Sequence, residues 1–174
     1  MKNLFLIGMM GSWKSTVGRK LAEYMDMEFI DTDDAIEEVT EMKISDIFSE
    51  LGEDRFRKME SAFFIEKAKQ TGQLFSTGGG IVLYSENRKV LKKYGTTFFL
   101  YASINVLANR IHNTKKRPLL IGSEILESRL DSIWKERKNF YTRSAHHTID
   151  TDNLNPTQVL DEILNLLEVP IANH

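Results

Sequence analysis

The chain has 174 residues and a mass of 20.1 kDa, enough for one well-buried domain and too little for two large ones. Its formal net charge of −2 at pH 7 gives no support for binding nucleic acid through a basic surface. Cysteine is absent, so disulfides and thiolate metal sites are excluded and a reducing cytoplasm is allowed. The apolar runs are too short for a membrane span. We therefore expect a cytoplasmic protein without a membrane partner, and a monomer at this size.

The first feature along the chain is a glycine-containing loop, Gly8 to Thr16. The apolar run Leu4 to Ile7 before it predicts a buried strand, and residues 17–25 after it have apolar positions at helical spacing. Strand, tight loop and helix are the context of a phosphate-binding loop, where backbone N–H groups and a helix N-terminus surround a phosphate. In such a loop the lysine, here Lys14, reaches the outer phosphates, and the hydroxyl of Ser15 binds a magnesium ion.

Trp13 stands where this loop pattern has a glycine. Glycine is expected there because the loop needs residues at positive φ, which cost a bulky residue roughly 1–2 kcal/mol. Two outcomes are open: the fold imposes the conformation with the indole outside the loop, or Trp13 changes the loop path so that Lys14 misses the phosphates. A plainer alternative for the whole stretch is an ordinary turn between strand and helix that contains a lysine.

A second predicted strand, Glu28 to Ile30, ends at a group of carboxylates. Acidic residues at the carboxyl end of a strand in an α/β sheet lie where ligands bind. Asp31 and Asp33 share one side if the strand continues, so that one could hold the magnesium shell while the other accepts hydrogen bonds from a substrate hydroxyl. Taken alone, the favoured alternative is a helix start, with Asp33 or Asp34 as the N-cap.

A long helix is predicted from residue 53 to about 70, followed by a strand over 73–76 and a run of three glycines. Arg57 and Glu60 are three apart, and this spacing alone favours an ion pair on the helix surface. A paired arginine can also clamp a carboxylate bidentately. The glycines, Gly78 to Gly80, suit a place where backbone approaches a ligand closely, the alternative being a flexible turn.

The second half of the chain continues the alternation of strands and helices. We expect helices over 85–94, 104–111 and 124–141, strands over 96–101 and 147–150, and a closing helix from Pro156. The basic loop over 112–122 is either a solvated face or a mobile segment that covers a phosphate site. The alternation implies one parallel sheet between layers of helices, with the phosphate loop, the acidic turn and the glycine run at one edge.

Taken together, these motifs resemble the shikimate kinases, from the nucleoside-monophosphate-kinase-like branch of P-loop folds. The resemblance covers nearly the whole chain and rests on an ordered set: Gly8–Thr16, Asp31-Thr32-Asp33, Gly52-Glu53 with Phe56-Arg57 and Glu60, Thr77–Gly80, Arg117-Pro118-Leu119-Leu120, and Arg137 with Tyr141. It implies a three-layer α/β/α fold with a five-stranded parallel sheet, like P-loop NTPases. It also implies a single kinase domain, 1–174, with substrate-binding helices over about 32–60 and a lid over about 112–123.

The activity that the resemblance implies is transfer of the γ-phosphoryl group of ATP to the 3-hydroxyl of shikimate, with Mg²⁺, in the pathway to aromatic amino acids. It assigns nucleotide binding to Gly11, Ser12, Trp13, Lys14, Ser15, Thr16, Arg110 and Arg117. It assigns shikimate binding to Asp33, Arg57, Gly78, Gly79, Gly80 and Arg137. It assigns magnesium to Ser15 directly and to Asp31 through water.

Within that set, the resemblance gives catalytic roles to Lys14, Asp33 and Arg117. Lys14 binds the β- and γ-phosphates, Asp33 orients the attacking hydroxyl, and Arg117 closes over the phosphates from the lid. Arg110 stacks on adenine, and Glu60 holds Arg57 in place. Some members also have an adenine-contacting arginine before the last helix, where this chain has Asn153 and Leu154.

Two other functions remain open at this point. One is a shikimate-binding protein whose nucleotide site is impaired by Trp13. The other is a P-loop kinase for another small molecule, such as gluconate or a nucleotide. Arg57 and Arg137 together with Asp33 argue against that second alternative, because they suit a substrate that carries a carboxylate and a diol.

Overall fold

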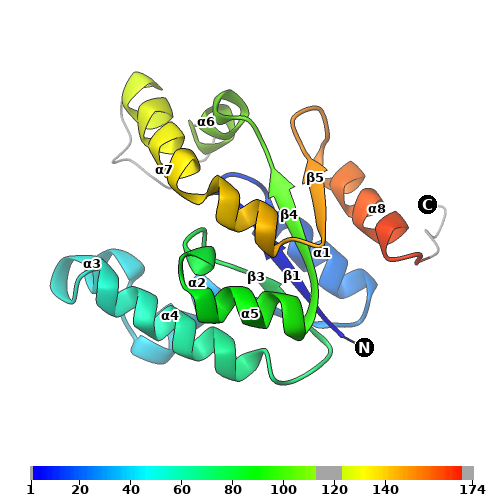
Figure 1. The fold of residues 1–174 in the computed structure, drawn as a ribbon, viewed down its shortest axis with the longest axis horizontal. Coiled ribbons are helices and arrows are strands. Elements are labelled where there is room, and N and C mark those ends of the chain that lie inside the picture. The colour runs from blue at the N-terminus through cyan, green and yellow to red at the C-terminus, as the bar shows by residue number, and fades with distance from the viewer. Residues whose placement is uncertain (1, 113–122, 170–174) are drawn as a thin grey trace.

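The computed structural model describes residues 2–112 and 123–169, and its centre is a five-stranded sheet (Figure 1). All four neighbouring pairs of strands are parallel, in the order β2-β3-β1-β4-β5. The strands are β1 (Asn3–Ile7), β2 (Glu28–Asp31), β3 (Gln73–Ser76), β4 (Gly95–Tyr101) and β5 (His147–Asp150). The sequence predicts each of them to within one residue at either end.

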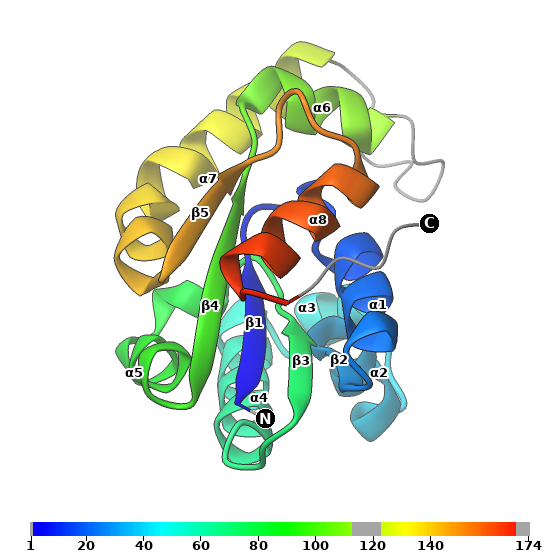
Figure 2. The same ribbon diagram turned by 90° about the vertical axis from the view of Figure 1, so that its right-hand side faces the viewer.

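Helices cover both faces of the sheet. They are α1 (Lys14–Tyr24), α2 (Thr32–Thr40), α3 (Ile44–Glu50), α4 (Glu53–Lys67), α5 (Ser85–Lys93), α6 (Ile104–His112), α7 (Ser123–Ser144) and α8 (Pro156–Leu166), with a short 3₁₀ helix, η1 (Ile81–Leu83). Figures 1 and 2 show α1 and α8 together on one face, and α4, α5 and α7 on the other. This arrangement confirms the predicted three-layer α/β/α fold.

The two faces of β1 explain the layers. Phe5 and Ile7 belong to the apolar cluster that α4 to α7 cover, whereas Leu4 and Leu6 belong to the cluster covered by α1 and α8. Because side chains alternate along a strand, a fully apolar strand needs helices on both sides. All five residues of β1 are buried, as this position between two layers requires.

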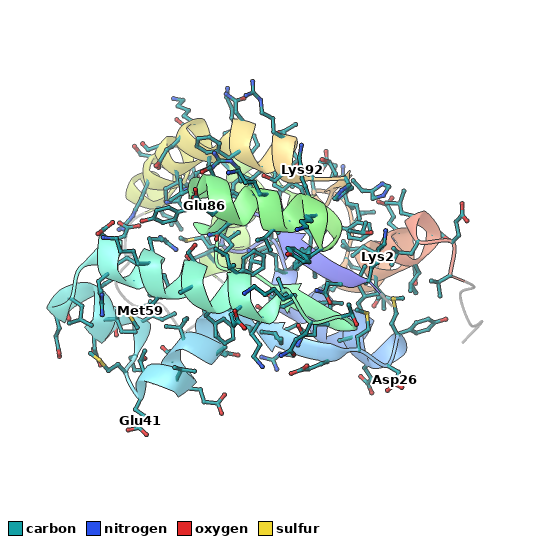
Figure 3. All side chains as sticks on the ribbon, turned by 60° about the horizontal axis from the view of Figure 1, so that its bottom comes forward. Lys2, Asp26, Glu41, Met59, Glu86 and Lys92 are labelled. Carbon is teal, nitrogen blue, oxygen red and sulfur yellow. The ribbon has the colours of Figure 1, made fainter. Side chains whose placement is uncertain are left out.

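The segment from α2 to α4, residues 32–67, extends beyond the sheet and is called the α2–α4 unit below (Figure 1). It has a small apolar cluster of its own, with Ile36, Ile47 and Phe56 buried. In Figure 3, Glu41 and Met59 mark this unit, on the opposite side of the view from Lys2 and Asp26. The sequence analysis leaves α3 unassigned, because a segment of seven residues is too short for its apolar spacing to identify a helix.

Three loops leave the sheet at one edge, where the carboxyl ends of adjacent strands meet. Leu6 at the end of β1 is in register with Ser76 of β3, and Ser76 is in register with Asp31 of β2. The phosphate loop, the acidic turn and the glycine run therefore begin side by side, as the sequence predicts. None of the described helices combines the length and the hydropathy that a bilayer span requires.

Candidate active site

The phosphate loop keeps its positive φ angles despite Trp13. Gly8, Gly11 and Trp13 have φ values of 149°, 81° and 68°. The backbone N–H of Val17 donates to the Trp13 carbonyl at 2.8 Å, so α1 begins directly after the loop. Of the two outcomes open for Trp13, the structure has the first: the left-handed conformation is retained.

Contacts of the indole account for this conformation. The guanidinium carbon of Arg110 lies 3.4 Å from the centroid of the Trp13 ring, and the indole packs against the apolar cluster under α1 and α8. A cation–π contact contributes about 0.5–2 kcal/mol, which is comparable with the roughly 1–2 kcal/mol cost of a left-handed bulky residue. The strain at Trp13 is therefore offset locally.

Lys14 lies inside the loop and is only 8% exposed. Its ammonium group donates to the Met9 carbonyl at 2.8 Å and to Ser12 Oγ at 3.4 Å. The positive charge is thus held beside the backbone amides of the loop, where a phosphate group would add a negative charge. This arrangement suits an anion site at the N-terminus of α1.

Oxygen ligands gather beside the loop at the ends of β2 and β3. Ser15 Oγ donates to Asp31 Oδ2 at 2.6 Å and lies 3.0 Å from Ser76 Oγ. Hydroxyl and carboxylate oxygens are the ligands that Mg²⁺ prefers, so this corner fits the ion chemically. We find no cluster of three or more His, Cys, Asp or Glu residues among the described residues that could hold a metal by itself.

The acidic turn differs from its predicted geometry. Helix α2 begins at Thr32, and its N-cap is Asp31, whose Oδ1 accepts from the Asp33 N–H at 3.1 Å. The prediction of Asp33 or Asp34 as the cap is wrong, and the strand does not continue to Asp33. The physical reason is that an aspartate at the strand end satisfies an orphan N–H of the first helical turn.

Arg57 and Glu60 form a buried pair. Arg57 Nη1 donates to Glu60 Oε2 at 2.8 Å, and the Glu60 side chain is only 1% exposed. The surface ion pair that the spacing favours is therefore wrong for Glu60, because the glycine run covers that face of α4. A Cβ atom at Gly78 would overlap Glu60 Oε1, and one at Gly80 would overlap the Arg57 guanidinium. Burial raises the pKa of Glu60 above its ordinary value, although Arg57 opposes the shift.

Two adjoining cavities contain nearly all the predicted site residues. A cavity of about 290 Å³, called the phosphate cavity, is lined by the loop, by Asp31 and Ser76 at the ends of β2 and β3, and by Arg110. A cavity of about 180 Å³, called the acceptor cavity, is lined by Arg57, Arg137 and the side of the glycine run. Met10, Asp33, Gly78 and Gly79 line both.

The predicted residues divide between the cavities as follows. The phosphate cavity has Gly11, Trp13, Lys14, Ser15, Thr16, Asp31 and Arg110 in its lining. The acceptor cavity has Asp33, Arg57, Gly78, Gly79, Gly80 and Arg137. Ser12 is fully buried under the loop, where its hydroxyl accepts from Lys14. Arg117 lies outside the described residues.

Tyr141 is a site residue to which sequence reasoning gives no role. Its hydroxyl donates to the Gly79 carbonyl at 2.5 Å, and its ring is stacked on Phe99 with centroids 5.1 Å apart. Burial raises the pKa of Tyr141 to about 12, so the hydroxyl keeps its proton at neutral pH. The available signal is its spacing: four residues after Arg137 in α7, it faces the same cavity.

This fold, with a phosphate loop at the carboxyl edge of a parallel sheet and a second cavity beside it, defines a P-loop phosphotransferase. The sequence model of the shikimate kinase family matches residues 10–168. The shikimate kinase of Sulfurihydrogenibium sp. is 41% identical over 168 residues, which are 97% of this chain and 99% of the relative. The chain belongs to the shikimate kinase family.

Solved structures agree with this assignment. Shikimate kinase from Acinetobacter baumannii, in complex with shikimate, has a TM-score of 0.89 and 36% identity, over 97% of this chain and 93% of that one. A gluconokinase from Sinorhizobium meliloti has a TM-score of 0.60 and 20% identity, over 96% and 91% of the two chains. The second likeness shows a shared fold alone, so it gives no support to the gluconate alternative.

Proposed function

We propose that this protein transfers the γ-phosphoryl group of ATP to the 3-hydroxyl of shikimate. One observation carries the proposal: a phosphate cavity and an acceptor cavity meet at Asp33, Gly78 and Gly79. A transferable phosphoryl group and a hydroxyl acceptor would meet at that boundary. Membership of the shikimate kinase family supports the choice of substrates.

On the nucleotide side, the chain supplies positioning and charge. Phosphoryl transfer has a loose transition state, so catalysis depends on holding the reactants in line and stabilising the phosphoryl oxygens. Lys14 and the backbone N–H groups of the loop would hold the β- and γ-phosphates. Ser15 and Asp31 would hold Mg²⁺, which neutralises charge on the phosphate oxygens when it is bound. Arg117, which lies outside the described residues, is assigned to the same phosphates.

On the acceptor side, Arg57 and Arg137 would bind the shikimate carboxylate. Arg137 Nε is buried and makes no hydrogen bond to the described residues, and its ion pair with Glu136 Oε2 is long, at 3.7 Å, so a substrate carboxylate would supply a closer partner. Glu60 would fix the plane of the Arg57 guanidinium through their 2.8 Å contact. Asp33, at the boundary of the cavities, would accept a hydrogen bond from the 3-hydroxyl and orient it toward the phosphorus.

The proposed residue roles also suggest a function for whole segments of the chain. We propose that the chain acts as a single kinase domain in which helices over about 32–60 bind shikimate and residues 112–123 form a lid. Most of that lid lies outside the described residues. We also propose that the protein is a monomer and acts in the cytoplasm, where ATP is available. A measurement of its mass in solution tests the monomeric state.

The direct test is release of ADP from ATP and Mg²⁺ with shikimate, gluconate or a nucleoside monophosphate as the acceptor. We expect a rate with shikimate only, and loss of most of it in Asp33→Asn. The matched control is Asp34→Asn, because Asp34 is exposed and pairs with Arg19 on the surface. A rate with gluconate, or equal rates for both variants, would contradict the proposal. ADP release by the unaltered protein would exclude a shikimate-binding protein without kinase activity.

Shikimate binding can be measured separately by thermal shift. A ligand at 100 times its Kd stabilises the folded state by about 2.7 kcal/mol, which raises the melting temperature measurably. We expect shikimate to do so and gluconate not to do so. Failure of shikimate to bind would contradict the roles of Arg57 and Arg137 whatever the state of the nucleotide site.

A further inference from the structure

The contact between Trp13 and Arg110 has a consequence for the nucleotide base. Both residues line the phosphate cavity, and neither lines the acceptor cavity. If phosphates are held by Lys14, Ser15 and Thr16, the nucleoside must leave the loop on the side away from the acceptor. A planar cation such as Arg110 in that part of the cavity is a natural surface for a base to stack on.

That surface is already covered. The Arg110 guanidinium carbon lies 3.4 Å from the centroid of the Trp13 ring, which is the distance between two planar groups in direct stacking contact. No second ring fits between them. The indole belongs to the phosphate loop itself, so it covers the face of Arg110 that is turned toward the loop.

Hydrogen bonds to Thr151 hold the Arg110 guanidinium in this orientation. Its Nη1 donates to Thr151 Oγ1 at 2.9 Å and its Nη2 donates to the Thr151 carbonyl at 2.5 Å. Thr151 Oγ1 donates in turn to the Tyr101 carbonyl at 2.8 Å, which fixes Thr151 on the end of the sheet. Turning the guanidinium would break two hydrogen bonds of a partly buried cation, and each of these is costly to lose.

We propose that Trp13 sets the nucleotide selectivity of this protein by occupying the stacking face of Arg110. The base then adds little to affinity, and recognition rests on the polyphosphate. The site accepts nucleoside triphosphates with little regard to the base. This inference rests on the proposed function, in which a nucleoside triphosphate is the phosphoryl donor.

Calorimetry with two probes isolates the contribution of the nucleoside. We would measure the Kd of pyrophosphate and of ADP, each with Mg²⁺, for the unaltered protein and for Trp13→Gly. The Kd of pyrophosphate divided by the Kd of ADP reports how much the nucleoside adds to affinity. We expect this ratio to rise about tenfold in Trp13→Gly, which corresponds to about 1.4 kcal/mol. Glycine also relieves the left-handed strain, but that change affects both probes and cancels in the ratio.

A kinetic readout follows the same logic. The preference for ATP over UTP in kcat/KM, with shikimate as acceptor, should rise by a similar factor in Trp13→Gly, because uracil has a smaller stacking surface than adenine. The matched control is Trp134→Phe at the other tryptophan, which packs on Phe99 and Tyr101 and lines neither cavity. Its ratio should equal that of the unaltered protein.

Each outcome decides the inference. An unchanged or lower Kd ratio in Trp13→Gly overturns it, because the indole would then be irrelevant or helpful to the base. A raised ratio without phosphorylation of shikimate by either protein supports the inference and overturns the proposed function. If neither the unaltered protein nor Trp13→Gly binds either probe, the loop is not a phosphate site and both are overturned.

Discussion

Replacing Tyr141 by phenylalanine removes one hydroxyl from beneath the boundary of the two cavities. That hydroxyl donates to the Gly79 carbonyl at 2.5 Å, and Tyr141 is fully buried. The ring remains stacked on Phe99. The variant therefore loses the hydrogen bond of the hydroxyl and leaves the buried Gly79 carbonyl without that donor. We expect a loss of about 1–2 kcal/mol in the free energy of unfolding. For a chain of this length that lowers the melting temperature by about 2–8 °C.

The functional effect should be larger than the effect on stability. Gly79 lines both cavities, so a shift of its peptide group moves backbone at the place where donor and acceptor meet. A displacement of about 1 Å in a reacting pair can cost on the order of 100-fold in rate. We expect kcat to fall at least about tenfold while the KM for shikimate changes less, because Arg57 keeps its pair with Glu60.

The assay is steady-state ADP release together with a thermal melt of the same samples. Tyr84→Phe is the matched control, because its hydroxyl bonds to Asp54 on the surface at 3.3 Å and lines neither cavity. This control should retain the unaltered kcat and melting temperature. If Tyr141→Phe behaves like the control, the hydrogen bond to Gly79 does not position the glycine run and the reasoning is refuted.

Three further variants test the buried pair and the proposed magnesium site. Gly80→Ala should raise the KM for shikimate about tenfold and also lower the melting temperature, because its Cβ would push the Arg57 guanidinium away from buried Glu60; an unchanged KM would contradict this. Burial raises the pKa of Glu60, so the stability gained from its proton is present below pH 4.5 and is lost as pH rises through the higher folded pKa. Urea unfolding at pH 4.5 and 7.5 should therefore show Glu60→Gln gaining stability relative to the unaltered protein at the higher pH, and the opposite trend would show that Arg57 outweighs burial. Asp31→Asn should raise the Mg²⁺ concentration for half-maximal rate about tenfold, through the weakened contact with Ser15, and a Mg²⁺ titration with the same midpoint would exclude that role.

The fold could be predicted because the strong signals are local. The apolar run of β1 and the strand–loop–helix order around Lys14 fix the position of the phosphate loop without any tertiary information. The glycine run after β3 is equally clear, since three successive glycines contribute no side chains to a core. Short apolar strands that alternate with amphipathic helices then leave one parallel sheet as the simplest arrangement.

The burial of charged groups could not be predicted in the same way. Spacing brings Arg57 and Glu60 together on α4, but burial depends on what crosses over that face, and the crossing segment is the glycine run from β3. The hydrogen bond of Tyr141 to Gly79 likewise joins residues 62 positions apart. The helix start at Asp31 was open for a different reason, because several adjacent acidic residues can each serve as a cap.

Trp13 shows how a local rule can be broken without loss of the local structure. A left-handed tryptophan costs about 1–2 kcal/mol, and its stack on Arg110 with the packing of the indole returns a similar amount. The substitution is therefore close to neutral for folding, and the loop keeps its shape. The indole does cover the face of the Arg110 guanidinium that is turned toward the loop. The consequence of Trp13 thus falls on the ligand and not on the fold, so nucleotide preference will reveal it more clearly than stability will.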